Sequence, residues 1–203
     1  MKNMLLGAAA ALSLALPGAA LAQRTPAATV VVVDTDRIYR DCTACRAAQG
    51  QLQALGTQLQ QRATTLGQPL ESELQSIQQA ANAARAQSGA ARTAAETTLQ
   101  QRAQRLDQQR TQAQQELARM EQTLRSTQAN VLQQINARLN PIINQVMTAR
   151  GANIAVDVNA TLAHAGALNV TDQVLTQLNA ALPSVTVAPL PAGQQPAPAQ
   201  PGR

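Results

Sequence analysis

The sequence predicts an α+β protein in which a small β-rich body carries one long antiparallel α-helical coiled-coil hairpin. Apolar residues in residues 42–150 recur at three- and four-residue steps, while most other positions there are Gln, Arg, Thr or Ala. This narrow stripe is typical of a coiled-coil seam. β-forming segments at residues 29–34 and 153–159 flank the stripe. The two ends of the hairpin should therefore return to a common base made by these strands.

The first half of the hairpin carries this stripe with one interruption, at Gly67 and Pro69. A proline in a helix interior removes one hydrogen bond and clashes with the preceding turn. We therefore expect a kink or a short break at Pro69. The apolar positions expected in the seam of this half are Leu52, Leu55, Leu59, Ala63, Leu66, Leu70, Leu74, Ile77 and Ala81.

The tip of the hairpin is expected at residues 86–90, where the stripe is lost and Gly89 supplies a turn residue. Pro141 marks the point where the second helix would turn into the base. About forty residues per helix give an arm of roughly 60–70 Å. The seam positions expected in the second half are Leu99, Leu106, Ala113, Leu117, Met120, Leu124, Val131, Ile135, Leu139, Ile142 and Val146.

The body is expected to contain three strands. Residues 30–33 are an unbroken β-branched run, which is typical of a strand buried on both faces. Ile154, Val156 and Val158 alternate with a small or polar residue, as in a strand with one covered face. Residues 161–168 are a weaker candidate for a third strand.

Two helix starts are also expected in the body. Asp34 and Asp36 can cap a helix that begins near Ile38. The residues from Asn169 to Asp172 can cap a short helix that lies on the sheet. So few elements cannot close a hydrophobic core alone, and copies of the chain should cover one another's apolar faces. The residues expected to be buried only in that oligomer are Val31, Val33, Ile154, Val156, Val174 and Leu175.

Both ends of the chain differ in composition from the middle. A positive start, a short apolar run and the small residues Ala20-Leu21-Ala22 predict a cleaved signal peptide and export to a bacterial periplasm. The run is too short to favour the alternative, an uncleaved anchor. Six of the ten prolines follow residue 182, which predicts a disordered tail. The expected division is signal peptide at 1–22, body at 23–41 and 151–182, arm at 42–150 and tail at 183–203.

The charge distribution separates arm from body. Residues 42–150 contain eleven arginines and six acids, a net charge of +5, whereas the rest of the chain after residue 22 has four arginines and five acids. A basic surface attracts acidic or amphipathic partners and is compatible with contact at a membrane surface. With one Tyr, no Phe and no Trp, the chain lacks the stacking platforms of nucleic-acid-binding proteins. It also offers few groups for a catalytic pocket, a metal site or a cofactor.

Cys42 and Cys45 have the spacing of a redox motif. A redox site would sit in a thioredoxin-like framework, which this sequence does not predict. A disulfide of structural role, or a pair of inert thiols, is the simpler reading in an oxidising compartment. A metal site would need further ligands, and His164 is the only histidine. Haem attachment would need a histidine at position 46, which is Arg46.

The order strand, long hairpin, strand and capped helix resembles the OmpH/Skp family of periplasmic chaperones. The resemblance covers about residues 29–181. It departs from the family in using Arg and Gln where many relatives have Lys and Glu, and in its Pro-rich tail and its cysteine pair. The stretches that carry it are VVVDTDRI at residues 31–38, LNPII at 139–143, ARGANIAVD at 149–157 and NVTDQVLTQLN at 169–179.

The resemblance implies a jellyfish-shaped homotrimer whose three arms enclose a cavity. Unfolded outer-membrane proteins would be held there without ATP or any cofactor and released to the outer-membrane assembly machinery. The alternatives are a structural coiled-coil spacer or adaptor of the envelope, and a thiol oxidoreductase that uses the cysteine pair. The arginines expected to contact clients are Arg62, Arg85, Arg92, Arg102, Arg105 and Arg110.

Overall fold

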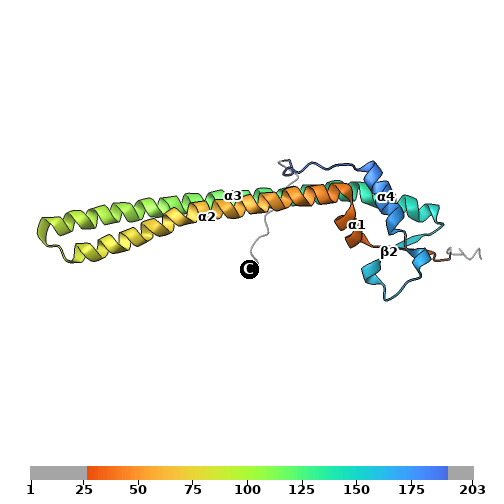
Figure 1. The fold of residues 1–203 in the computed structure, drawn as a ribbon, viewed down its shortest axis with the longest axis horizontal. Coiled ribbons are helices and arrows are strands. Elements are labelled where there is room, and N and C mark those ends of the chain that lie inside the picture. Colours follow the sequence, from red (N-terminus) through yellow and green to blue (C-terminus); the bar gives the residue numbers. More distant parts are fainter. Residues whose placement is uncertain (1–26, 192–203) are drawn as a thin grey trace, which may run out of the picture.

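A computed structural model of the chain describes residues 27–191. It shows a long arm of two helices that lie side by side, with a small body at one end (Figure 1). The expected signal peptide and residues 192–203 lie outside the described residues. The elements are β1 (Val30–Val33), α1 (Thr35–Asp41), α2 (Thr43–Arg85), α3 (Gly89–Ala149), β2 (Ile154–Asp157), the 3-10 turns η1 (Val158–Ala160) and η2 (Gly166–Leu168), and α4 (Thr171–Ala181).

The sheet of the body consists of β1 and β2, paired in parallel, with Val30 opposite Ile154 and Val33 opposite Asp157. β1 is buried from Val31 to Val33, which agrees with a strand covered on both faces. β2 is shorter than predicted, because Val158 begins η1. Its Ile154 remains 41% exposed in the single chain.

The predicted third strand is wrong. Among the described residues, 161–168 form a loop that ends in η2, and the only further pairing is a single bridge from Val32 to Asn169. The reason lies in composition, because alanines, a glycine and a histidine separate Leu162 from Leu168 and leave no β-branched run. The body therefore contains less strand and more helix than expected.

The two short helices start differently. α4 follows Val170 without a side-chain cap hydrogen bond, which corrects the expected cap, although the Asn169 side chain accepts from the Thr171 N–H at 2.9 Å. The Asp34 carboxylate accepts a hydrogen bond from the Arg37 N–H at 2.8 Å and caps α1, as the sequence predicted. Asp36 lies within the first turn of α1 instead of capping it. The Asp34 N–H donates to the Thr171 hydroxyl at 2.9 Å, so the end of β1 is joined to the first residue of α4.

Neither proline ends its helix, so the short break expected at Pro69 and the turn into the base expected at Pro141 are wrong, while the kink at Pro69 stays a prediction. α2 runs without a break through Pro69, and α3 runs through Pro141 to Ala149. A single proline removes one backbone hydrogen bond, which helices of this length can absorb by bending slightly. α3 thus continues past the arm into the body. Its length follows from the parallel sheet, because the chain must return to the start of β2 at the far end from where it left β1.

The lower end of α3 builds the core of the body. Leu139, Ile142 and Val146 form one buried cluster with Val31 and other residues of β1, α1 and α4. The expectation that the body needs an oligomer to bury its apolar residues is therefore wrong in part. A single chain already buries Val31, Val33 and Val174, to 4%, 2% and 0% exposure. Ile154, Val156 and Leu175 stay at least partly exposed.

The first nine residues of the predicted tail are ordered against α3, which corrects the expectation of disorder for that part. We call residues 183–191 the strap. Leu190 is 6% exposed, and Val185 and Val187 pack against the core of the body. The Leu190 N–H donates to the Ser126 hydroxyl at 2.9 Å.

Candidate functional site

The arm leaves much of its apolar seam in contact with solvent. Leu106 and Ala113 are buried, whereas the α2 leucines at 55, 59, 66, 70 and 74 are only half-buried. Ala63, expected in the seam, is exposed. This follows from the architecture, because two helices share a single contact line and have no further layer to cover its flanks. The arm therefore presents a continuous, partly open apolar stripe.

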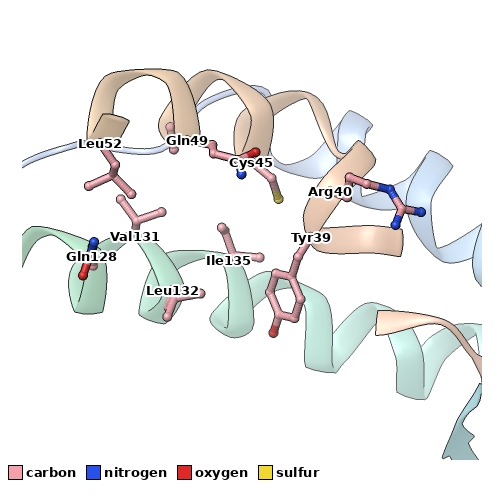
Figure 2. Close-up of a pocket in the computed structure, with 10 residues that line it drawn as sticks. Tyr39, Arg40, Cys45, Gln49, Leu52, Gln128, Val131, Leu132 and Ile135 are labelled. Carbon is pink, nitrogen blue, oxygen red and sulfur yellow. The ribbon is translucent and has the colours of Figure 1, made fainter. Parts of the chain in front are cut away.

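Two apolar grooves follow the contact line between α2 and α3. The root groove, of about 410 Å³, lies where the arm meets the body and is lined by Leu52, Val131, Leu132 and Ile135 among others (Figure 2). Leu132 is 49% exposed at this groove. The arm groove, of about 180 Å³, lies further out, and its apolar lining residues are Leu55, Leu59, Met120 and Leu124. Met120 is well suited to contact varied apolar surfaces, because its side chain is flexible and polarizable.

Two of the six predicted arginines join the two helices of the arm. Arg62 Nε lies 2.6 Å from Glu116 Oε1, and Arg102 donates two hydrogen bonds of 2.9 Å to the carboxylate of Glu73. Arg102 also donates to the Ser76 hydroxyl at 2.8 Å. Because residue numbers rise along α2 as they fall along α3, these pairs fix an antiparallel register. Arg62 and Arg102 thus stabilise the arm itself.

These ion pairs make the arm sensitive to acid. The side-chain hydrogen bond from Arg102 lowers the pKa of Glu73, and that from Arg62 lowers the pKa of Glu116. A carboxyl with a lowered folded-state pKa stabilises the fold above its unfolded pKa and loses that contribution as the pH falls through the folded pKa. The Arg62–Glu116 pair is exposed and the Arg102–Glu73 pair partly exposed to solvent, so their contribution is small and weakens with salt.

The other predicted arginines are differently placed. Arg92 pairs with Glu96 one turn along the same helix, at 2.8 Å. Arg85, Arg105 and Arg110 form no ion pair within the described part of the chain. Arg85 lies at the turn at residues 86–88, whereas Arg105 and Arg110 lie further back along α3, toward the middle of the arm. We call these three the free arginines. Their charges are therefore the ones available to a ligand.

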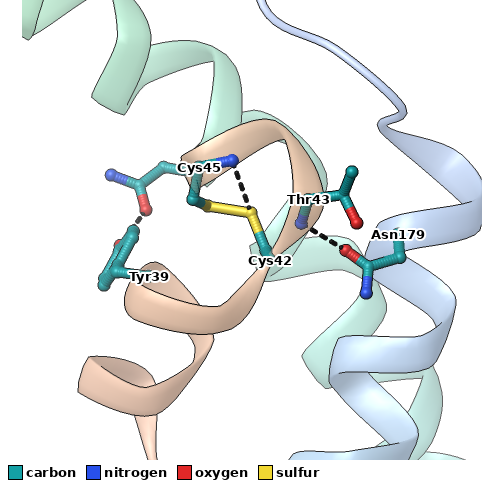
Figure 3. The surroundings of a disulfide bond; sticks show 6 residues. Tyr39, Cys42, Thr43, Cys45 and Asn179 are labelled. Carbon is teal, nitrogen blue, oxygen red and sulfur yellow. Dashed lines mark hydrogen bonds between the residues drawn. A yellow bond between two sulfur atoms is a disulfide. The ribbon is translucent and has the colours of Figure 1, made fainter. Parts of the chain in front are cut away.

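Cys42 and Cys45 form a disulfide at the start of α2 (Figure 3). Cys42 is the N-cap residue, and its sulfur accepts a hydrogen bond from the Cys45 N–H at 3.0 Å. Nearby, the Thr43 N–H donates to the Asn179 side chain at 2.8 Å, and the Tyr39 hydroxyl donates to Asn136. The two cysteines are 1% and 5% exposed. Such burial opposes attack by an external thiolate and favours a structural role at the junction of arm and body.

Replacing both cysteines with alanine should therefore lower stability but leave binding function nearly unchanged. We expect the melting temperature to fall by several degrees, since a short disulfide loop contributes about 2 kcal/mol. Ligand binding should stay within a factor of about two, because Cys45 at the edge of the root groove is only 5% exposed and alanine keeps that edge apolar. Thermal unfolding and a binding assay on the same sample test this. Loss of binding by an intact, folded variant would instead indicate thiol chemistry.

Other site types find no support in the described residues. No group of three or more His, Cys, Asp or Glu side chains is placed there to hold a metal ion. His164 lies in the loop between η1 and η2, with its Nδ1 3.3 Å from the Ala165 carbonyl oxygen. None of the described helices is long and apolar enough to cross a bilayer.

The fold and the surface together define a class: elongated α+β proteins in which a small mixed body carries a basic, two-helix arm. The chain belongs to the family of OmpH-like outer membrane proteins, whose family model matches residues 29–178.

Comparison with solved structures gives the same fold. An OmpH-like protein from Caulobacter crescentus, provisionally assigned as an outer membrane chaperone, superposes with a TM-score of 0.63 and 20% sequence identity. The match covers 94% of this chain and 100% of that chain. No curated protein matched the sequence significantly.

Proposed function

We propose that this protein is a periplasmic, ATP-independent holdase chaperone that binds unfolded outer-membrane proteins between the arms of a homotrimer. The observation that carries the proposal is the arm, which combines a half-open apolar stripe with free arginines. Membership of the OmpH-like family supports a chaperone role. The chaperone assignment of the Caulobacter protein, which shares the fold, points the same way.

The surface of the arm suits loose binding of a non-native barrel strand. Such a strand alternates apolar and polar residues and carries acidic loops at its ends. Apolar side chains can enter the root groove and the arm groove, while the stems of long arginine side chains cover apolar surface. Many weak contacts hold a client without a fixed sequence and release it to a tighter acceptor, the outer-membrane assembly machinery.

Aggregation of a barrel protein provides the test of this function. A urea-unfolded outer-membrane barrel protein is diluted into buffer with and without this protein, in the absence of nucleotide, and turbidity is followed. A holdase suppresses the turbidity near one oligomer per client. A structural spacer leaves it unchanged, and that result would refute the proposal.

We further propose that copies of the chain assemble through the body. Ile154 on β2 and Leu168 on η2 are 41% and 38% exposed in the single chain, and Leu162 between them is fully exposed. Leu175 is also only partly covered. Apolar surface of this kind on one small body is typical of an interface between copies.

Shortening the arm should leave the oligomer intact. The buried α3 residues between positions 131 and 146 belong to the core of the body, so the deletion must spare that part of α3. We expect a variant that lacks residues 56–123, closed by a short Gly/Ser turn, to have the same number of subunits as the full chain by light scattering. Changing Ile154 and Leu162 to aspartate in that variant should produce monomers, because two charges would enter the interface. A shortened variant that is monomeric before this change would contradict assembly through the body.

A further inference from the structure

The strap is held by three side chains that lie one helical turn apart on α3. Gln134 Nε2 donates to the Thr186 carbonyl and Gln134 Oε1 accepts from the Thr186 N–H, both at 2.9 Å. Asn130 Nδ2 donates to the Ala188 carbonyl at 2.8 Å. The Ser126 hydroxyl accepts from the Leu190 N–H at 2.9 Å. We call Ser126, Asn130 and Gln134 the polar ladder.

The spacing of these bonds matches an extended chain. Four residues of an α-helix rise about 6 Å, and two residues of an extended strand span about 6.5 Å. Every second strap residue, at 186, 188 and 190, therefore hydrogen-bonds to the next side chain of the polar ladder, and the strap runs antiparallel to α3. Gln134 Nε2 also donates to Asn130 Oδ1 at 3.1 Å, which orients the two amides.

These hydrogen bonds involve only the backbone of the strap. The side chains of residues 185–187 alternate as those of a strand do, and beyond a bend at residue 188 Leu190 is buried as well. Val185 and Val187 pack against the core of the body, whereas Thr186 between them is exposed. The ladder can thus hold any extended segment whose alternate residues are apolar, whatever its detailed sequence.

We propose that the polar ladder and the apolar surface beside it form a binding site for an extended polypeptide strand, which the strap occupies in cis. An unfolded barrel strand has the same extended backbone and the same alternation, so it competes with the strap. The site deepens the chaperone function proposed above, on which the identity of the competing ligand rests. The strap keeps this surface covered until a client replaces it.

Peptide binding to opened variants tests the site. The probe is a fluorescein-labelled peptide with blocked ends and the sequence of residues 183–191, followed by anisotropy. One opened variant ends after Leu182, and a second keeps the full chain but carries Val185→Asp and Val187→Asp. Both should bind the probe at least about tenfold more tightly than the full-length protein, because a cis segment competes at a high effective concentration. The second variant keeps the test valid if truncation prevents folding.

Substitutions in the ladder provide the matched control. Asn130→Ala with Gln134→Ala, in an opened variant, should weaken binding of the probe at least about tenfold. Gln133→Ala with Asn140→Ala, at exposed positions of the same helix, should leave it unchanged. Equal binding by the full-length protein and both opened variants would overturn the proposal. So would binding that survives loss of the ladder amides.

Competition separates this inference from the chaperone proposal. A urea-unfolded barrel protein should displace the probe from an opened variant, and failure to displace it would show that clients do not use the site. The turbidity assay reports on the full-length chaperone independently of the probe. A protein that binds the probe but leaves turbidity unchanged would refute the chaperone function and retain the strand-binding site.

Discussion

Replacing the free arginines Arg85, Arg105 and Arg110 with glutamine should slow capture of an anionic unfolded barrel protein by about tenfold at low salt. These side chains have no ion pair among the described residues, so their field acts on an approaching client. A trimer would lose about three times the charge of one chain. The stability of the arm should hardly change, because Arg62 still pairs with Glu116 on α3 and Arg102 still pairs with Glu73 on α2.

Stopped-flow fluorescence at about 50 and about 300 mM salt measures this effect, since screening shortens the reach of the field. The chain has no tryptophan, so the tryptophan emission of the client reports capture without background. The control variant, Arg46, Arg138 and Arg150 to glutamine, removes the same charge from three arginines near the body that also have no ion pair among the described residues. If both variants capture at the wild-type rate at both salts, charge steering is wrong and apolar contact alone drives capture.

Leu139→Ala should lower the free energy of unfolding by about 2–5 kcal/mol, because it opens a cavity in the core of the body. Leu139 is 2% exposed and lies where α3 crosses the body. Leu99→Ala, half-buried near the outer end of the arm, should cost only about 1 kcal/mol. Urea unfolding distinguishes them, with Tyr39 fluorescence for the body and far-UV circular dichroism for all helices. Equal losses would contradict a body that is the stable core and an arm that is a thin extension.

The features that depend on local sequence could be predicted. The β-branched run from Val30 to Val33 forms a buried strand, and Asp34 caps the following helix. The stripe of apolar residues forms the contact line between α2 and α3. These outcomes follow from periodicity and capping chemistry, which act over a few residues.

Features that depend on packing between distant segments could not be predicted. The core of the body closes within one chain because α3 continues past Pro141. The local sequence does not show which distant segments this part of α3 will pack against. The Pro-rich composition after residue 182 indicated disorder, yet the strap is held by side chains more than fifty residues earlier, such as Gln134. The alternation of Val185 and Val187 was the signal that could have revealed it.

The candidate site was likewise only partly readable from composition. Composition predicts that the arm is basic, but it does not show which arginines form ion pairs within the arm and which are left for a ligand. Arg62 and Arg102 meet glutamates on the opposite helix, and this pairing depends on the antiparallel register. The two grooves arise where half-buried leucines of both helices meet, which a single-helix pattern cannot show.

The most direct test of the central claim is isolation of the complex between this protein and an unfolded client. A urea-unfolded barrel protein is diluted with the wild-type protein in nucleotide-free buffer, and the mixture is separated by size-exclusion chromatography with light scattering. We predict a soluble complex with the mass of about one client per oligomer, in which client tryptophan emission stays that of an unfolded chain. Elution of this protein alone, with the client lost to aggregate, would contradict the account.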